Sequence, residues 1–255
     1  MLRKIVDHTK ETIALRKRVK PITELTITIS EHPQDFKIIF KEDTIALIAE
    51  IKKASPSHGI IKRDLDPVQL GLIYETSGAE AISVVTNEAF FGGKCEYITE
   101  LKKVSKLPLL RKDFILDEYQ IYESRAVGAD GVLLIARILD EQELKRMVKL
   151  VKKLGMTPIV EVHSREDIHK ALATETEIIG INNRNLDNFQ VDIAISLFLK
   201  PYIPSGYYIL SESGIKNKEE VKKLQEAGFD GILVGTAILM ANDIKKKIAE
   251  LKWRD

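Results

Sequence analysis

The sequence is poor in the features that mark secreted or membrane proteins. It has one cysteine, Cys95, among 255 residues, so no disulfide can form within the chain and a reducing compartment is expected. Its longest apolar runs, such as 132–136, are far shorter than the roughly 20 residues of a transmembrane helix. The first 20 residues are basic but lack the apolar stretch of a signal peptide. We therefore expect a cytoplasmic protein without a membrane partner.

A large charge of one sign is also missing. The chain has 39 Lys and Arg residues against 38 Asp and Glu residues, which gives a formal net charge of +1. This balance argues against a nucleic-acid partner, because such binding requires a broad basic surface, but it leaves room for a local anion site. The five histidines are not spaced from each other or from the cysteine as metal ligands are, so no metal is expected.

The sequence does contain a regular alternation of short apolar runs and amphipathic stretches from residue 44 onward. The runs are mostly continuous and rich in β-branched residues, which is typical of parallel strands covered on both faces. Eight runs are expected to be strands: 44–51, 81–86, 108–112, 131–136, 157–162, 178–181, 207–210 and 231–234. The stretches between them begin with helix-capping patterns at Asp66, Asp140, Ser164 and Asn217. This order predicts an α/β protein with a parallel sheet.

A weak internal repeat favours closure of the sheet into a barrel. The segments 78–82, 128–132 and 228–232 each contain a helix-ending glycine, an acidic turn residue and the start of a buried run. Their spacing of 50 and 100 residues fits two and four βα units of about 25 residues. We predict a (β/α)8 TIM barrel. An open doubly wound sheet is the alternative, but no Gly-x-Gly-x-x-Gly motif follows the first run.

Residues 1–43 do not follow this alternation. Near the start of this segment, residues at helical spacing predict an amphipathic helix that packs on the barrel. They are Leu2, Ile5, Val6, Thr9 and Ile13. We therefore expect one domain, 1–255, with an N-terminal helical extension, 1–43, and a barrel, 44–255. The extension could plug the bottom of the barrel or form a flap over its active end.

Charged and polar residues gather where the predicted strands end. Active sites of βα barrels lie at the carboxyl ends of the strands, so these residues are expected to share one mouth. The set is Glu50, Lys52, Lys112, Glu161, Asn182, Arg184, Ser211, Glu212 and Ser213. Opposite charges at a partly buried rim shift pKa values, which general acid–base catalysis uses.

A phosphate site is expected beside these charges. Gly214 follows the seventh predicted strand, and Gly235 and Thr236 follow the eighth. Barrels frequently bind phosphate through these two loops, whose backbone N–H groups face the anion. Ser55 lies in a Ser-Pro-Ser-His-Gly loop after the first strand, which could close over the same site.

Two aromatic residues complete the candidate site. Phe91 and Phe114 follow the second and third predicted strands and could wall an aromatic substrate. Ordinary packing of these loops on the core explains either residue equally well.

Seven segments also match a known family of barrels, in the same order along the chain. They are IAEIKKASPSHG (48–59), LLRKDFILDEYQI (109–121), GADGVLLIARIL (128–139), IVEVHSRED (159–167), IGINNRNL (179–186), SESGI (211–215) and LVGTAIL (233–239). The E-x-K-x-x-S-P-S and K-D-F patterns in the first two are specific. Together the segments resemble indole-3-glycerol-phosphate synthase, and the resemblance covers residues 44–240.

The resemblance implies a tryptophan-pathway lyase that acts without cofactor or metal. Its substrate, 1-(2-carboxyphenylamino)-1-deoxyribulose 5-phosphate, is cyclised with loss of CO₂ and water. Lys112 matches the general acid, and Lys52 matches a lysine that holds the anthranilate carboxylate and assists dehydration. Glu161 and Glu50 match carboxylates that position the lysines, stabilise the developing iminium and remove the final ring proton. The division of roles among the four stays open.

The resemblance also implies a set of substrate-binding residues. Asn182 and Ser213, or the neighbouring Ser211, match hydrogen-bonding partners, and Glu212 belongs to the same segment. The further matches are Arg184 for the carboxylate or the loop, Ser55, Gly214, Gly235 and Thr236 for the phosphate, and Phe91 and Phe114 for the aromatic walls. Leu233, which begins the LVGTAIL segment, is also expected to bind substrate.

Two other functions are compatible with the residues. A barrel aldolase would form a Schiff base through Lys52 or Lys112 and would be trapped by borohydride. A catalytically inactive barrel would only bind a phosphorylated ligand or a partner protein. The expected partner is a small phosphorylated substrate, and only the inactive barrel could bind a protein instead. We expect a monomer or a weak homo-oligomer.

Overall fold

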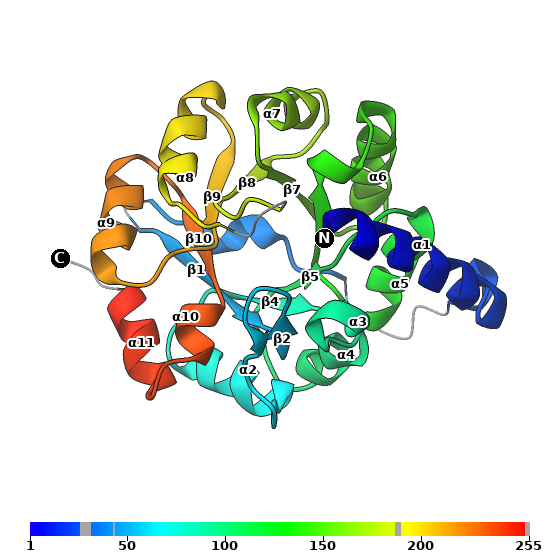
Figure 1. Cartoon of the computed structure of the whole chain (residues 1–255), viewed down its shortest axis with the longest axis horizontal. Helices are drawn as coiled ribbons and strands as arrows, with labels where there is room; N and C mark the ends of the chain where they lie inside the picture. The colour runs from blue at the N-terminus through cyan, green and yellow to red at the C-terminus, as the bar shows by residue number, and fades with distance from the viewer. Residues whose placement is uncertain (26–31, 43, 187–189, 253–255) are drawn as a thin grey trace.

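The computed structural model describes residues 1–25, 32–42, 44–186 and 190–252. Eight parallel strands close into a barrel in the order β1-β10-β9-β8-β7-β6-β5-β4 (Figure 1). They are β1 (Ala46–Ile51), β4 (Ala81–Val85), β5 (Leu109–Lys112), β6 (Gly131–Ile135), β7 (Thr157–Val162), β8 (Ile178–Asn182), β9 (Tyr208–Glu212) and β10 (Gly231–Val234). β1 pairs with both β10 and β4, which confirms the predicted barrel and excludes the open sheet.

Helices surround the strands (Figure 1). The longer ones are α2 (Pro67–Thr76), α4 (Glu96–Lys102), α5 (Glu118–Val127), α6 (Glu141–Lys153), α7 (Arg165–Leu172), α8 (Ala194–Leu199), α9 (Lys218–Glu226) and α11 (Ile244–Leu251). Four of them begin at the predicted caps, where the side chain accepts a backbone N–H: Asp66, Asp140, Ser164 and Asn217. No helix in the described part of the chain is both long and apolar enough to cross a membrane.

Short elements form the loops at the carboxyl ends of the strands. They are the hairpin β2 (Ala54–Ser55) and β3 (Gly59–Ile60) after β1, α3 (Glu88–Phe91) after β4, and α10 (Thr236–Leu239) after β10. The short 3-10 helices are η1 (Ile22–Glu24), η2 (Phe36–Ile39), η3 (Ala136–Ile138) and η4 (Lys200–Tyr202).

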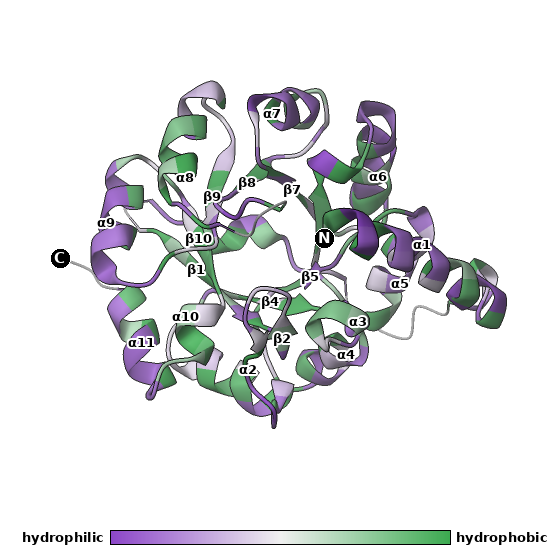
Figure 2. Ribbon diagram, in the orientation of Figure 1, coloured by the Kyte–Doolittle hydropathy of each residue, from purple (hydrophilic) through white to green (hydrophobic). Residues whose placement is uncertain are grey.

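Alternation along the strands divides the core into two apolar clusters. Inward-facing residues such as Ile48, Leu110 and Leu210 fill the barrel, while outward-facing residues such as Leu47 and Leu109 pack against the helices. Figure 2 shows the matching pattern, with apolar strands and helices that are polar mainly on their outer sides. Burial on both faces explains why the strand sequences are continuously apolar.

The N-terminal extension covers both ends of the barrel. The helix α1 (Leu2–Val19) lies along α5, where Arg16 pairs with Glu123 at 3.3 Å (Figure 1). Its buried Ile5 joins the inner cluster at the mouth of the barrel.

At the other end, η2 plugs the barrel. Phe36 is fully buried, and its backbone N–H donates to Thr157 Oγ1 at 3.1 Å, at the start of β7. The extension therefore supplies a plug and a cover at the mouth, through two different segments. Residues 26–31 and 43 of the predicted extension lie outside the described residues.

Candidate active site

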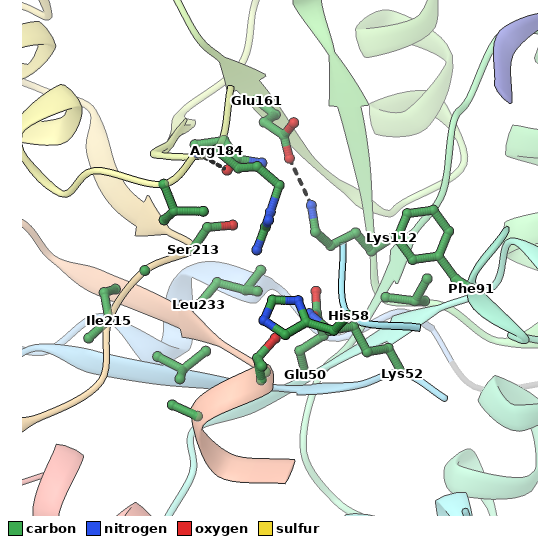
Figure 3. A pocket seen from close by; sticks show the side chains of 18 of the residues that line it. Glu50, Lys52, His58, Phe91, Lys112, Glu161, Arg184, Ser213, Ile215 and Leu233 are labelled. Atoms are coloured by element: carbon green, nitrogen blue, oxygen red, sulfur yellow. Dashed lines mark hydrogen bonds and ion pairs between the residues drawn. The ribbon is translucent and has the colours of Figure 1, made fainter. Parts of the chain in front are cut away.

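A cavity of about 630 Å³ opens at the carboxyl ends of the strands (Figure 3), where barrel active sites lie. Most of the residues predicted from the sequence line it: Glu50, Lys52, Phe91, Lys112, Phe114, Glu161, Asn182, Arg184, Ser213, Gly214, Leu233, Gly235 and Thr236. The strands that carry them are far apart in the sequence, and closure of the barrel brings their ends together.

Lys112, at the end of β5, is held by two carboxyl groups. Its Nζ lies 2.7 Å from Glu161 Oε2 on β7 and 3.2 Å from Glu212 Oε2 on β9. Burial alone would lower the pKa of Lys112, but the charges of Glu161, Glu212 and Glu50 outweigh it and raise this pKa. Lys112 is therefore protonated at neutral pH, which is the form that a general acid needs in order to donate a proton.

The two glutamates beside Lys112 titrate in opposite directions. Burial favours the neutral form of both, but Lys112 and His163 outweigh it at Glu161 and lower the pKa of that carboxyl. At Glu212, burial and the charge of Glu161 outweigh Lys112 and raise the pKa. Two buried carboxyl groups beside one ammonium group thus retain a proton between them.

Glu50 and Lys52 form a second pair at the end of β1. Lys52 Nζ lies 2.5 Å from Glu50 Oε1, and the glutamate is 4% exposed. Burial would raise the pKa of Glu50, but Lys52 and Lys112 lower it below its usual value. The two side chains meet because residues two apart in an extended chain face the same way.

Arg184 links two loops over the cavity. Its backbone N–H donates to Asn182 Oδ1 at 2.9 Å, and its Nη1 donates to Ser57 Oγ at 3.2 Å, across from the loop after β1. Figure 3 shows its side chain extending into the cavity, between Ser213 and Lys112. A guanidinium group in this place can bind an anionic substrate group.

The loops after β9 and β10 line another part of the cavity. Ser213 and Gly214 both have left-handed backbones, with φ of 68° and 84°. Such a conformation is uncommon for serine and is often found at functional sites. Gly235 packs against Glu50, and a Cβ there would overlap the Glu50 carboxyl group. This close approach requires glycine at 235, in addition to its predicted place in an anion loop.

An aromatic pair borders a smaller side cavity. The Phe91 and Phe114 rings lie 6.1 Å apart between centroids, and both line the side cavity together with Lys52 and Arg184. Leu2 and Ile5 of α1 close it. The sequence predicted an amphipathic helix here and left open whether it plugs the bottom of the barrel or covers its active end; the structure places Leu2 and Ile5 at the active end.

Comparison with known proteins identifies the family. The family model described as indole-3-glycerol phosphate synthase matches residues 2–251. The indole-3-glycerol phosphate synthase of Thermoanaerobacter pseudethanolicus is 45% identical over 251 residues, 98% of this chain and 96% of that protein. The same enzyme of Aliarcobacter butzleri is 43% identical over 258 residues, 99% of this chain and 98% of that protein. The chain belongs to the indole-3-glycerol phosphate synthase family. It is an enzyme of the decarboxylating lyase class that closes the indole ring in tryptophan biosynthesis.

Solved structures of lower identity share the fold. A 3-hexulose-6-phosphate synthase from Salmonella typhimurium aligns with a TM-score of 0.66 at 15% identity, over 82% of this chain and 97% of that chain. A tryptophan synthase α-subunit mutant from Pyrococcus furiosus aligns with a TM-score of 0.61 at 14% identity, over 83% of this chain and 98% of that chain. These likenesses show the barrel architecture alone.

Three predicted residues of the family site lie elsewhere than expected. Ser211 faces outward, because Glu212 faces inward in the same strand. Its Oγ lies 2.7 Å from Ser196 Oγ on α8, and Ser213, the other serine predicted for this contact, lines the cavity. Glu212 is fully buried against Lys112 instead of lining the cavity. Ser55 lines the side cavity and not the part bordered by Gly214.

Two histidines join the site without having been predicted there. His58 lines the cavity (Figure 3), and its place in the Ser-Pro-Ser-His-Gly loop was the available signal. His163 Nε2 lies 3.3 Å from Glu161 Oε1, and burial lowers the pKa of the histidine. Within the described ranges, no group of three or more His, Cys, Asp or Glu residues is arranged to hold a metal ion.

Proposed function

We propose that the chain converts 1-(2-carboxyphenylamino)-1-deoxyribulose 5-phosphate to indole-3-glycerol phosphate, and that Lys112 is the general acid. The observation that carries this proposal is the position of the Lys112 ammonium group, 2.7 Å from Glu161 and 3.2 Å from Glu212, beside the cavity. Lys112 donates a proton to the substrate carbonyl oxygen as the aryl carbon attacks. Glu161, ionised beside it, stabilises the iminium that develops.

Lys52 and the aromatic pair orient the anthranilate half of the substrate in this proposal. The ring lies between Phe91 and Phe114, and its carboxylate faces Lys52 and Arg184, which line the same side cavity. Once CO₂ has left, Lys52 assists loss of water. Glu50, whose pKa is lowered, or Glu161 removes the last ring proton. Asn182 and Ser213 hydrogen-bond the substrate.

The phosphate of the substrate binds in the loops after β9 and β10. This assignment is supported by Gly214, Gly235 and Thr236, which line one part of the cavity, and by the usual position of phosphate sites in barrels. Leu233 lies in the same lining. The substrate then extends from these loops past Lys112 to the aromatic pair, which places its carbonyl group near the acid.

Replacement of Lys112 tests the proposal. With this substrate, the Lys112→Met variant is expected to form indole product, followed by its fluorescence, about 10² to 10⁴ times more slowly than the native chain. Lys106→Met is the matched control, because Lys106 is exposed and precedes β5, at the opposite end of the barrel. Native turnover by the Lys112 variant would remove Lys112 from the role of acid.

The alternative of a Schiff-base aldolase has a separate test. Imine formation requires a neutral amine, whereas the surroundings of Lys112 raise its pKa. Borohydride added during turnover should therefore leave no covalent adduct. A trapped adduct at Lys112 or Lys52 would favour the aldolase. An inactive binding barrel would bind the substrate but fail to rescue a tryptophan auxotroph.

We also propose that the chain acts in the cytoplasm as a single domain, and as a monomer or weak homo-oligomer. A lone thiol, Cys95, suits a reducing compartment. Sedimentation velocity over a range of protein concentrations tests the oligomeric state, since a tight dimer would keep the sedimentation coefficient of a particle of twice the chain mass at every dilution.

A further inference from the structure

Gly180 occupies an inward-facing position in the middle of β8. Two residues earlier, Ile178 belongs to the inner apolar cluster, and two residues later, Asn182 lines the cavity. A side chain at position 180 would therefore also point into the barrel. Gly180 lies directly beside Glu161 on β7 in the strand register, while Glu212 on β9 pairs with Asn182. Gly180 is thus located between the two strands that carry the partners of Lys112.

The Glu212 carboxyl group fills the space that a side chain at 180 would need. A Cβ built on Gly180 would overlap Glu212 Oε1 and would lie 3.2 Å from Glu212 Cδ. Gly180 is not among the residues with positive φ, so backbone conformation does not explain a glycine here. The close approach of the carboxyl group does.

We propose that Gly180 and Glu212 form a positioning pair for Lys112. The missing side chain at 180 lets the Glu212 carboxyl group lean across β8, so that Lys112 has a second carboxyl partner besides Glu161. With Glu161 alone, the long lysine side chain could turn about a single contact. Two partners fix the direction of its ammonium group, and displacement of a reacting group by about 1 Å can cost 10²-fold in rate.

The burial of the pair supports this role. Glu212 is 0% exposed, and its Oε2 lies 3.2 Å from the Lys112 ammonium nitrogen. The groups that face Glu212 are Lys112 from β5 and Glu161 from β7. Burial together with Glu161 keeps this carboxyl in its protonated form over a wide pH range, because its pKa is raised. Glu212 therefore lies against Lys112 while the negative charge of the two carboxyl groups resides on Glu161.

A double-mutant cycle tests the pair in the full chain. Gly180→Ala is expected to lower kcat about 10- to 100-fold and to change KM less than about threefold, because the phosphate loops are untouched. In the Glu212→Ala background the added methyl group has room, so Gly180→Ala should then change kcat less than about twofold. If Gly180→Ala lowers kcat by the same factor in the native chain and in the Glu212→Ala variant, the proposal is wrong.

A second readout needs no substrate and therefore separates this inference from the proposed function, on which the kinetic test rests. ¹⁵N NMR of the lysine Nζ groups, with the Lys112 signal assigned by its loss in Lys112→Met, reports the titration of Lys112 directly. In the native chain, Gly180→Ala should lower the pH at which Lys112 titrates. In a chain that already carries Glu212→Ala, the same substitution should not change this pH further. An unchanged titration would overturn the pairing even where kcat falls. If the native chain shows no turnover, the proposed function is wrong, and the NMR titrations alone then test the Gly180–Glu212 pair.

Matched variants separate positioning from a general loss of stability. Gly131→Ala adds a methyl group at the bottom of the barrel, 3.1 Å from the Phe36 ring and 3.3 Å from Leu110, and should leave the Lys112 titration unchanged. Glu212→Asp withdraws the carboxyl group by one methylene without adding an atom at 180. It should shift the Lys112 titration downward, and so it tests the pair even where Gly180→Ala does not fold.

Discussion

Replacement of Lys112 by methionine would leave Glu161 and Glu212 inside the barrel without their cation. The two glutamates are 1% and 0% exposed, and methionine keeps most of the apolar stem, so the change is mainly electrostatic. A buried carboxylate without a partner takes up a proton instead of remaining charged. Since the pKa of Glu212 is already raised in the native chain, the variant needs one further proton, on Glu161.

The size of the effect follows from the ordinary pKa of glutamate, 4.5. Each pH unit above this value costs about 1.36 kcal/mol to hold the proton, so the cost is about 1.4 kcal/mol at pH 5.5 and about 3.4 kcal/mol at pH 7. The folded variant binds a proton that the unfolded chain has released, and its stability therefore falls as the pH rises. In the native chain the pKa of Glu161 is lowered. Its contribution to the free energy of unfolding is therefore present above pH 4.5 and is lost only in more acidic solution.

Urea unfolding followed by circular dichroism, at several pH values between about 5.5 and 7, measures this difference. The free energy of unfolding of Lys112→Met should fall below that of the native chain by about 1.4 kcal/mol for each pH unit. The double variant Lys112→Met/Glu161→Gln cannot take up the proton and should lose this slope. A destabilisation that does not depend on pH would refute the reasoning.

Three further predictions concern other parts of the barrel. Burial raises the pKa of Cys95 to about 12, so at pH 8 its reaction with a thiol reagent should be at least ~10 times slower in the folded chain than in urea; equal rates would contradict this. Phe36→Ala should lower the free energy of unfolding by about 3–5 kcal/mol, against less than about 0.5 kcal/mol for the exposed Ile38→Ala, and similar losses in both would argue against the plug. The raised pKa of Glu212 makes the native chain lose stability as the pH rises from 4.5. Glu212→Gln should therefore gain about 1 kcal/mol or more relative to the native chain between pH 5 and pH 8 in urea titrations, and a constant difference would contradict a protonated Glu212.

Local features of the sequence determined the elements of the fold. Continuous β-branched runs located all eight strands to within two residues of their ends, because strands buried on both faces leave little choice of side chain. Capping residues such as Asp140 located helix starts, since a cap acts on the N–H groups two or three residues ahead. Because the predicted strands are parallel, their carboxyl ends lie at one end of the barrel, and this predicted that Lys52, Lys112 and Glu161 share one site.

Contacts between distant segments could not be obtained in this way. The sequence placed Ser211 and Glu212 together at the mouth, and only the closed barrel shows that Glu212 faces inward against Lys112 while Ser211 faces α8. The same closure brings Lys112 against Glu161, 49 residues away, and Arg184 against Ser57, 127 residues away. The retained proton of the Glu161–Glu212 pair and the need for glycine at 180 depend on these contacts, because burial and distance to a charge are properties of the folded chain. The sequence by itself thus determined the strands, the caps and the residues at the mouth, and the tertiary structure decided which of them touch and in what state of protonation.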